Sequence, residues 1–137
     1  MFSDDGKRFH GDDLPWQELK SRLEDFGWHD LTHRKVNLNV CGTAIEFRGV
    51  DDAHLQRDDY STIAGAVAPD TFGVGVSHAP YLRILDGMQR DGVGITFAGH
   101  THGGQLCIPF YGALVTNCDI DTRRAKGLHE HHGMAMH

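Results

Sequence analysis

Apolar and polar residues alternate in regular patterns over most of the chain, and these patterns predict its helices. Pro15 stands before a stretch in which apolar residues recur at helical spacing, and Gly27 follows it. Because proline favours the first turn of a helix and glycine favours its end, a helix is expected between them. The same spacing predicts a helix over residues 81–90 and a short one over residues 60–67.

Strict alternation of apolar and polar residues predicts strands between these helices. Residues 36–40 and 45–47 alternate on either side of Cys41-Gly42, which is the pattern of a hairpin. Residues 72–76 and 93–97 alternate as well, and the glycines within 72–76 indicate a face that another layer covers closely. Strands that alternate with helices are typical of α/β folds, in which ligands bind at the carboxyl ends of the strands. The sequence therefore predicts the α/β class.

The two ends of the chain carry weaker patterns. Residues 1–13 are rich in Asp and Gly and are expected to form a flexible lead-in to one domain over residues 14–128. Residues 129–137 are rich in His and Met, which could bind a soft or borderline metal ion. The expectation here is a flexible tail at the chain end.

Length and composition agree with one globular domain. Of the 137 residues, 39% are hydrophobic and 23% are charged, which is ordinary for such a domain. The net charge of −6 makes nucleic acid an unexpected partner, since the largest basic cluster is Arg123-Arg124 with Lys126. Three cysteines without C-x-x-C spacing, and no apolar run that could cross a bilayer, favour a cytoplasmic protein with no membrane partner.

Histidine is enriched, with 11 residues, and two of them stand in the stretch Gly99-His100-Thr101-His102-Gly103-Gly104-Gln105. Residues two apart on an extended chain project to the same side, so His100 and His102 are candidate metal ligands. The glycines permit a close approach of the backbone to an ion or an oxyanion. Imidazole nitrogen suits zinc, iron, nickel and copper, and tolerates manganese beside carboxylates.

This stretch, with residues 106–109 after it, resembles the last motif block of the calcineurin-like metallophosphoesterases. It is most similar to the bacterial branch in which that block reads G-H-T-H-G-G-Q. Val76-Ser77-His78-Ala79-Pro80 resembles the family's S-H-x-P block, and a segment of helix length separates the two blocks. The resemblance covers about residues 16–128.

The resemblance implies an α/β/β/α sandwich whose site holds two divalent ions of manganese, iron or zinc. His78 and His100 would bind one ion and His102 the other, while Gly103 and Gly104 would leave backbone room near a bound phosphate. The implied reaction is hydrolysis of a phosphate ester, a phosphodiester in particular, by a metal-bound hydroxide. No residue is assigned as the catalytic acid.

The family's earlier motifs, a D-x-H, a G-D and a G-N-H-D, have no counterpart in their usual setting. Asp52-Ala53-His54 spells D-x-H, but no bridging G-D follows it, so it is interpreted as a solvated loop with a turn-forming aspartate. Gly27-Trp28-His29-Asp30 is similar to G-N-H-D, but an indole cannot bind a metal. The chain is therefore interpreted as the C-terminal half of such a domain, truncated in its N-terminal half.

Two functions stay open on this interpretation. One is a metal-dependent phosphoesterase, and the other is a catalytically inactive remnant that binds metal through three imidazoles or serves as an interaction module. The loss of the first strands of a sandwich would expose a sheet edge and apolar faces. This predicts a homo-oligomer, or a separate partner that supplies the missing half.

Overall fold

The computed structural model describes residues 14–104, 106–108 and 112–137, and the chain forms two compact units that divide after Asp30. The first unit contains α1 (Trp16–Asp25), which confirms the predicted N-terminal helix. Gly27 follows it with a φ of 85°, a left-handed value that glycine adopts without strain. The lead-in expected over residues 1–13 lies outside the described residues.

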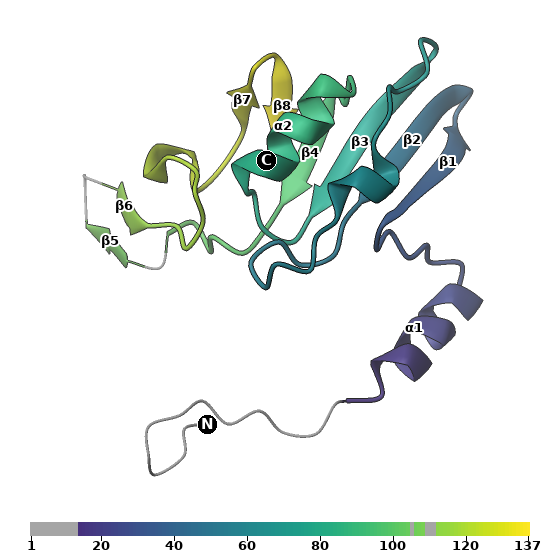
Figure 1. Cartoon of the computed structure of the whole chain (residues 1–137), viewed down its shortest axis with the longest axis horizontal. Coiled ribbons are helices and arrows are strands. Elements are labelled where there is room, and N and C mark those ends of the chain that lie inside the picture. Colours follow the sequence, from purple (N-terminus) through teal and green to yellow (C-terminus); the bar gives the residue numbers. More distant parts are fainter. Residues whose placement is uncertain (1–13, 105, 109–111) are drawn as a thin grey trace. The chain divides into compact units, whose positions relative to one another are not determined.

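The second unit is built on a six-stranded sheet, and Figure 1 shows its strands fanned side by side. The strands are β1 (Arg34–Val40), β2 (Thr43–Gly49), β3 (Thr71–Ser77), β4 (Ile95–Ala98), β7 (His129–His131) and β8 (Met134–Met136). In the order β1-β2-β3-β4-β8-β7, the central four strands are parallel and the two edge strands are antiparallel to their neighbours. β5 (Leu106–Ile108) and β6 (Gly112–Val115) form a separate pair. The fold is therefore mixed α/β, as predicted.

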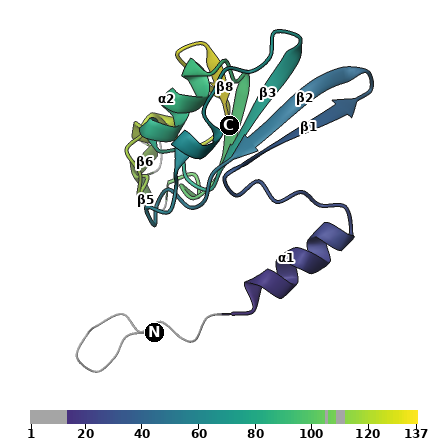
Figure 2. The same ribbon diagram turned by 45° about the vertical axis from the view of Figure 1, so that its right-hand side comes forward.

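Helix α2 (Leu82–Arg90) and the short helix η1 (Tyr60–Ile63) lie on one face of this sheet (Figures 1 and 2), and η2 (Thr122–Arg124) follows β6. Ile84, Leu85 and Met88 of α2 are buried and form the centre of the core. Met88 packs so closely on Gly75 of β3 that a Cβ there would collide with its sulfur. This contact confirms that the glycine-containing strand carries a tightly covered face.

Residues 129–137 differ from the flexible tail expected of them, because they contain β7 and β8. Met134 and Met136 are each only 2% exposed and belong to the core, and β8 pairs with β4. Gly133 closes the turn with a φ of 88°. Burial of two alternate methionines beneath α2 stabilises a hairpin whose own strand propensity is weak.

The opposite face of the sheet carries exposed apolar side chains in the described part of the second unit. Phe72, Val76 and Phe97 are 48%, 36% and 45% exposed. The strand registers place Val76 beside Phe97, and Ile45 between Leu38 and Phe72, so these residues share one surface. An exposed apolar face was expected from the sequence, and the oligomer inferred from it stays a prediction.

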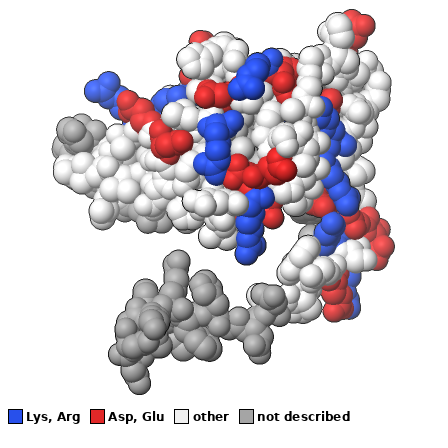
Figure 3. Space-filling model, viewed as in Figure 1, with Lys and Arg blue, Asp and Glu red and all other residues white. Residues whose placement is uncertain are grey.

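Charged residues of both signs lie beside each other on the face drawn in Figure 3. Arg83 of α2 forms an ion pair with Asp58, with 2.6 Å between Nη2 and Oδ1. Arg48 of β2 is completely buried and is held by Glu46 and by Asp91. The Oδ2 atom of Asp91 lies 2.9 Å from Nη1 of Arg48.

Among the described residues, no helix has the length and apolarity needed to cross a membrane.

Candidate metal centre at the carboxyl ends of β3 and β4

Two of the predicted ligands meet where neighbouring parallel strands end. β3 and β4 are parallel and pair up to Ser77 and Ala98, so the residues that follow them emerge at the same edge of the sheet. The Gly99 amide donates a hydrogen bond of 3.0 Å to the His78 carbonyl, which joins the two loops. The His100 and His78 rings lie beside each other, with 3.2 Å between Nδ1 of His100 and Nε2 of His78.

The loop after β2 brings a third imidazole and a carboxylate to this point. The ring of His54 lies 4.2 Å from that of His100, measured between centroids, and Asp52 Oδ2 lies 3.9 Å from His78 Nε2. The other oxygen of Asp52 accepts a hydrogen bond from the His54 amide, which confirms its turn-forming role. The interpretation of this loop as solvated surface was therefore incomplete. We call Asp52, His54, His78 and His100 the histidine cluster.

Arg83 of α2 and Tyr81, which directly precedes α2, hold this loop in place. Arg83 donates to the Ala53 carbonyl at 2.7 Å and stacks its guanidinium on the ring of Tyr81, 4.6 Å from the centroid. The Tyr81 hydroxyl donates to the Asn117 carbonyl at 3.3 Å, so it accepts from Nδ1 of His54 at 3.1 Å. This assignment puts the ring proton of His54 on Nδ1 and leaves a lone pair on Nε2.

His100 is the residue of the cluster most clearly suited to bind a metal ion. Its Nδ1 atom faces Nε2 of His78, and its Nε2 atom is buried without a hydrogen bond to any residue that the structure describes, so a metal ion at Nδ1 would leave the ring proton on Nε2. Burial, together with the neighbouring rings of His54 and His78, lowers the pKa of His100, and a weaker backbone contact to Asn117 acts in the opposite direction. The imidazole is therefore neutral at pH 7 and keeps the lone pair that a metal ligand needs.

His102, the third predicted ligand, lies on the same loop but is exposed to solvent. No hydrogen bond or ring contact joins it to His78 or His100 among the residues described. It lines, with His100 and Lys126, a cavity of about 310 Å³. His100 and His102 have φ values of 65° and 53°, which are rare for residues with a side chain and are typical of functional loops.

The glycines after His102 are required by the backbone rather than by crowding. Gly103 and Gly104 have φ values of 72° and 92°, which favour glycine. A Cβ at Gly103 would make only an ordinary contact with Lys126, at 3.5 Å. Gln105 and Pro109, which complete the motif block, lie outside the described residues. The backbone at Gly103 is therefore open to a neighbouring group.

Two ring nitrogens of the histidine cluster have the spacing of two ligands on one divalent metal ion. Two ligand atoms bound to the same tetrahedral ion at about 2.0–2.1 Å lie about 3.4 Å apart, and the two nitrogens of His78 and His100 are 3.2 Å apart. Imidazoles with one carboxylate form a mixed nitrogen and oxygen set that suits manganese, iron and zinc.

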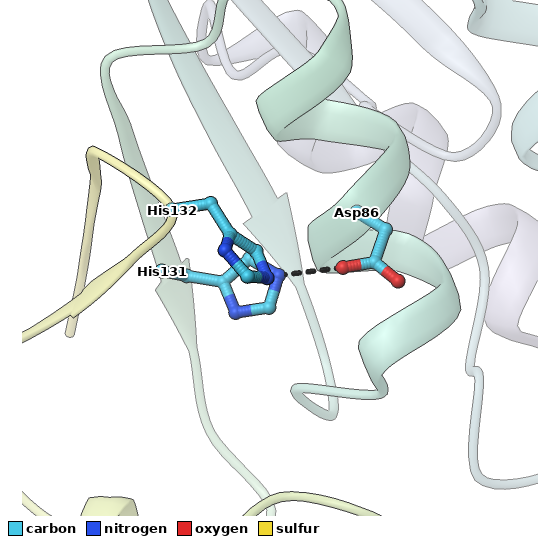
Figure 4. A group of neighbouring side chains, drawn as sticks. All are labelled: Asp86, His131 and His132. Atoms are coloured by element: carbon cyan, nitrogen blue, oxygen red, sulfur yellow. Dashed lines mark hydrogen bonds and ion pairs between the residues drawn. The ribbon is translucent and has the colours of Figure 1, made fainter.

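A second group of possible ligands lies on another part of the second unit. Asp86 of α2 and His131 and His132 of the β7–β8 hairpin each offer one ligand atom, and these three atoms lie within 4.8 Å of one another. Figure 4 shows the two rings side by side, facing the Asp86 carboxylate. The sequence indicated that these histidines could bind metal but favoured a flexible tail, so the participation of Asp86 was missed.

Comparisons with known proteins find a relative that is described as a metallophosphoesterase. The chain is 34% identical over 77 residues to YkuE of Bacillus subtilis, described as an uncharacterized metallophosphoesterase. It is 28% identical over 89 residues to YpbG of the same organism, an uncharacterized protein. These matches cover 55% and 65% of the chain but only 26% and 34% of the two relatives, so the chain spans about a quarter to a third of their length. No family model and no solved structure matches the chain.

Proposed function

We propose that the chain is part of a metal-dependent phosphoesterase of the calcineurin-like family, and that the histidine cluster and His102 belong to its metal centre. The observation that carries the proposal is the contact of His78 with His100 at two adjacent strand ends. It brings together one residue from each motif that resembles the family. The similarity to YkuE, which is named a metallophosphoesterase, supports the same reaction class.

Each side chain of the cluster has its own role in binding a metal ion. His78 and His100 offer ring nitrogens, and Asp52 contributes the negative charge that balances a divalent cation. Tyr81 fixes the ring of His54 by its hydrogen bond to Nδ1, so that Nε2 can act as a further ligand or receive a proton. A bound divalent ion supplies an activated water and neutralises charge on the phosphate ester.

The cavity beside His100 and His102 is the place we assign to the substrate. Manganese, iron or zinc ions held by the three histidines would attract the phosphate of an ester, with a phosphodiester as the proposed substrate class. Lys126 lines the cavity and adds a positive charge beside Gly103. The backbone of Gly103 and Gly104 carries no side chain that would obstruct the phosphate.

The exposed apolar face of the sheet supports an architectural part of the same proposal. In an α/β/β/α sandwich, a second sheet packs on the face opposite the helices. Phe72, Val76 and Phe97 are suitable residues for that contact, since each is more than one third exposed. We therefore place the chain in the C-terminal half of the sandwich, with the first half supplied by other residues.

The test is hydrolysis of bis(p-nitrophenyl) phosphate by the purified chain with added Mn²⁺, Fe²⁺ or Zn²⁺. The proposal predicts metal-dependent release of nitrophenolate that disappears in His78→Ala and in His100→Ala. His29→Ala is the matched control, because His29 is exposed in the first unit, and it should keep the full rate. Equal rates in all variants would contradict the proposal. No hydrolysis by a chain that still binds metal would favour the inactive remnant instead.

A further inference from the structure

The group Asp86, His131 and His132, which we call the hairpin site, lies apart from the histidine cluster. β8 runs parallel to β4, so the turn that precedes β8 lies at the amino end of these strands. His100, in contrast, follows the carboxyl end of β4. The hairpin site is therefore separate from the histidine cluster, and the proposed function does not account for it.

The three side chains converge on one point at the protein surface (Figure 4). Nε2 of His131 lies 2.7 Å from Oδ1 of Asp86, and the rings of His131 and His132 are 4.6 Å apart between centroids. The His131 side chain is only 4% exposed, whereas that of Asp86 is 51% exposed. A buried imidazole is thus combined with a carboxylate that solvent and ions can reach.

The backbone around the hairpin site is fixed before any ion binds. His132 has a φ of 50°, a conformation that is strained for residues with a side chain. Gln89 of α2 donates to the His132 carbonyl at 3.1 Å, which ties the turn to the helix. The buried Met134 anchors the strand that follows. The ligands therefore lie on two packed elements rather than on a mobile loop, which is the arrangement that metal sites require.

We propose that the hairpin site binds one Zn²⁺ ion through His131, His132 and Asp86, and that this ion links the β7–β8 hairpin to α2. Two histidines and one carboxylate form a known zinc donor set, with a fourth position left for water. Nε2 of His131 and Oδ1 of Asp86, now 2.7 Å apart, would move apart to about 3.4 Å, the separation across a tetrahedral zinc. The exposed side of Asp86 gives the ion access.

Zinc binding requires the ring proton of His131 to change position. Nη2 of Arg124 lies 3.3 Å from Nδ1 of His131, and an arginine can only donate, so the ring proton stands on Nε2 and is shared with Asp86. Zinc at Nε2 moves this proton to Nδ1. The guanidinium of Arg124 must then move away from the ring of His131. It keeps its hydrogen bond to the Glu130 carbonyl, which lies 3.2 Å from the same Nη2.

The experiment is equilibrium dialysis of the whole chain against buffered Zn²⁺, with the thermal unfolding midpoint measured beside it. His132→Asn removes one imidazole but tolerates the left-handed backbone, and Asp86→Asn keeps an acceptor for His131. Each variant should lose one equivalent of zinc, with a dissociation constant raised at least about tenfold, and should lose the zinc-dependent rise of the midpoint. His29→Asn should bind zinc as the wild type does.

The His100→Ala variant separates this inference from the proposed function. It should retain the zinc equivalent that His132→Asn and Asp86→Asn lose, whatever it loses at the histidine cluster. Zinc binding and midpoint shifts that stay unchanged in both hairpin-site variants would overturn the inference. The midpoints without zinc show whether each variant is folded.

Discussion

The Nδ1 atom of His100 lies 3.2 Å from the Nε2 atom of His78, although the two residues are 22 positions apart in the chain. Parallel pairing of β3 with β4 brings their loops to one edge, and the hydrogen bond from Gly99 to His78 fixes the loops there. The rest of the histidine cluster gathers around this pair. The sheet therefore sets the spacing of the two nitrogens before a metal ion binds.

Removal of the Tyr81 hydroxyl should weaken the proposed reaction without unfolding the protein. The hydroxyl fixes the tautomer of His54, and loss of such outer contacts typically lowers activity about tenfold or more. We expect Tyr81→Phe to lower kcat by about this factor at an unchanged unfolding midpoint. The double variant His54→Ala/Tyr81→Phe should be no slower than His54→Ala. Additive losses in the double variant would show that Tyr81 does not act through His54.

The ion pair that anchors the cluster loop to α2 should make stability depend on pH. Hydrogen bonds from Arg83 lower the pKa of Asp58 below its usual 3.8. The stabilisation is therefore fully present above about pH 3.8 and is lost as the pH falls through the folded-state pKa. Asp58→Asn should lower the free energy of unfolding by about 1 kcal/mol at pH 7, and this difference should vanish in acid.

Asp70→Asn is the matched control for that measurement, because Asp70 is exposed and should leave the unfolding free energy unchanged. Urea unfolding followed by circular dichroism at several pH values gives both curves. A difference between Asp58→Asn and wild type that persists undiminished at the lowest pH would contradict the assignment.

The C-terminal hairpin should contribute strongly to stability. Met134 is 2% exposed and its sulfur lies 3.2 Å from the Thr96 hydroxyl. Met134→Ala should lower the free energy of unfolding by about 2–5 kcal/mol, the usual cost of such a cavity. Leu128→Ala, at a side chain 68% exposed, should change it by less than about 0.5 kcal/mol. A flexible tail would instead make the two variants equally stable.

The exposed face of the sheet should cause self-association at micromolar concentration. Phe72 and Phe97 lie on this face, each nearly half exposed. We expect light scattering to give a mass above the 15.2 kDa of one chain, and Phe97→Lys to lower it. Leu128→Lys introduces the same charge at an exposed residue outside the strands and should leave the mass unchanged. A clean monomer mass for the wild type would contradict the prediction.

Local sequence patterns were sufficient for the elements with strong periodicity. The first helix, the β1–β2 hairpin, β3, α2 and β4 were predicted because their apolar residues repeat at helical or strand spacing over several residues. The pairing of His78 with His100 was implied by the family resemblance, and the parallel pairing of β3 with β4 explains how the two residues meet.

The parts that were missed depend on contacts between residues far apart in the chain. Asp52 and His54 belong to a loop without periodicity, and its position is set by Arg83 and Tyr81 of a later helix. β8 is only three residues long, and its burial beneath α2 outweighs the polar histidines around it. Sequence spacing contains no information on either contact.

The central claim is that the histidine cluster binds a divalent metal ion, and imidazole NMR in the presence of Mn²⁺ tests it most directly. Substoichiometric Mn²⁺ should broaden the ring signals of His54, His78 and His100, because a paramagnetic ion relaxes nearby nuclei. His100→Ala should abolish the broadening at the other two rings. Sharp signals for His78 and His100 at saturating Mn²⁺ would contradict the account.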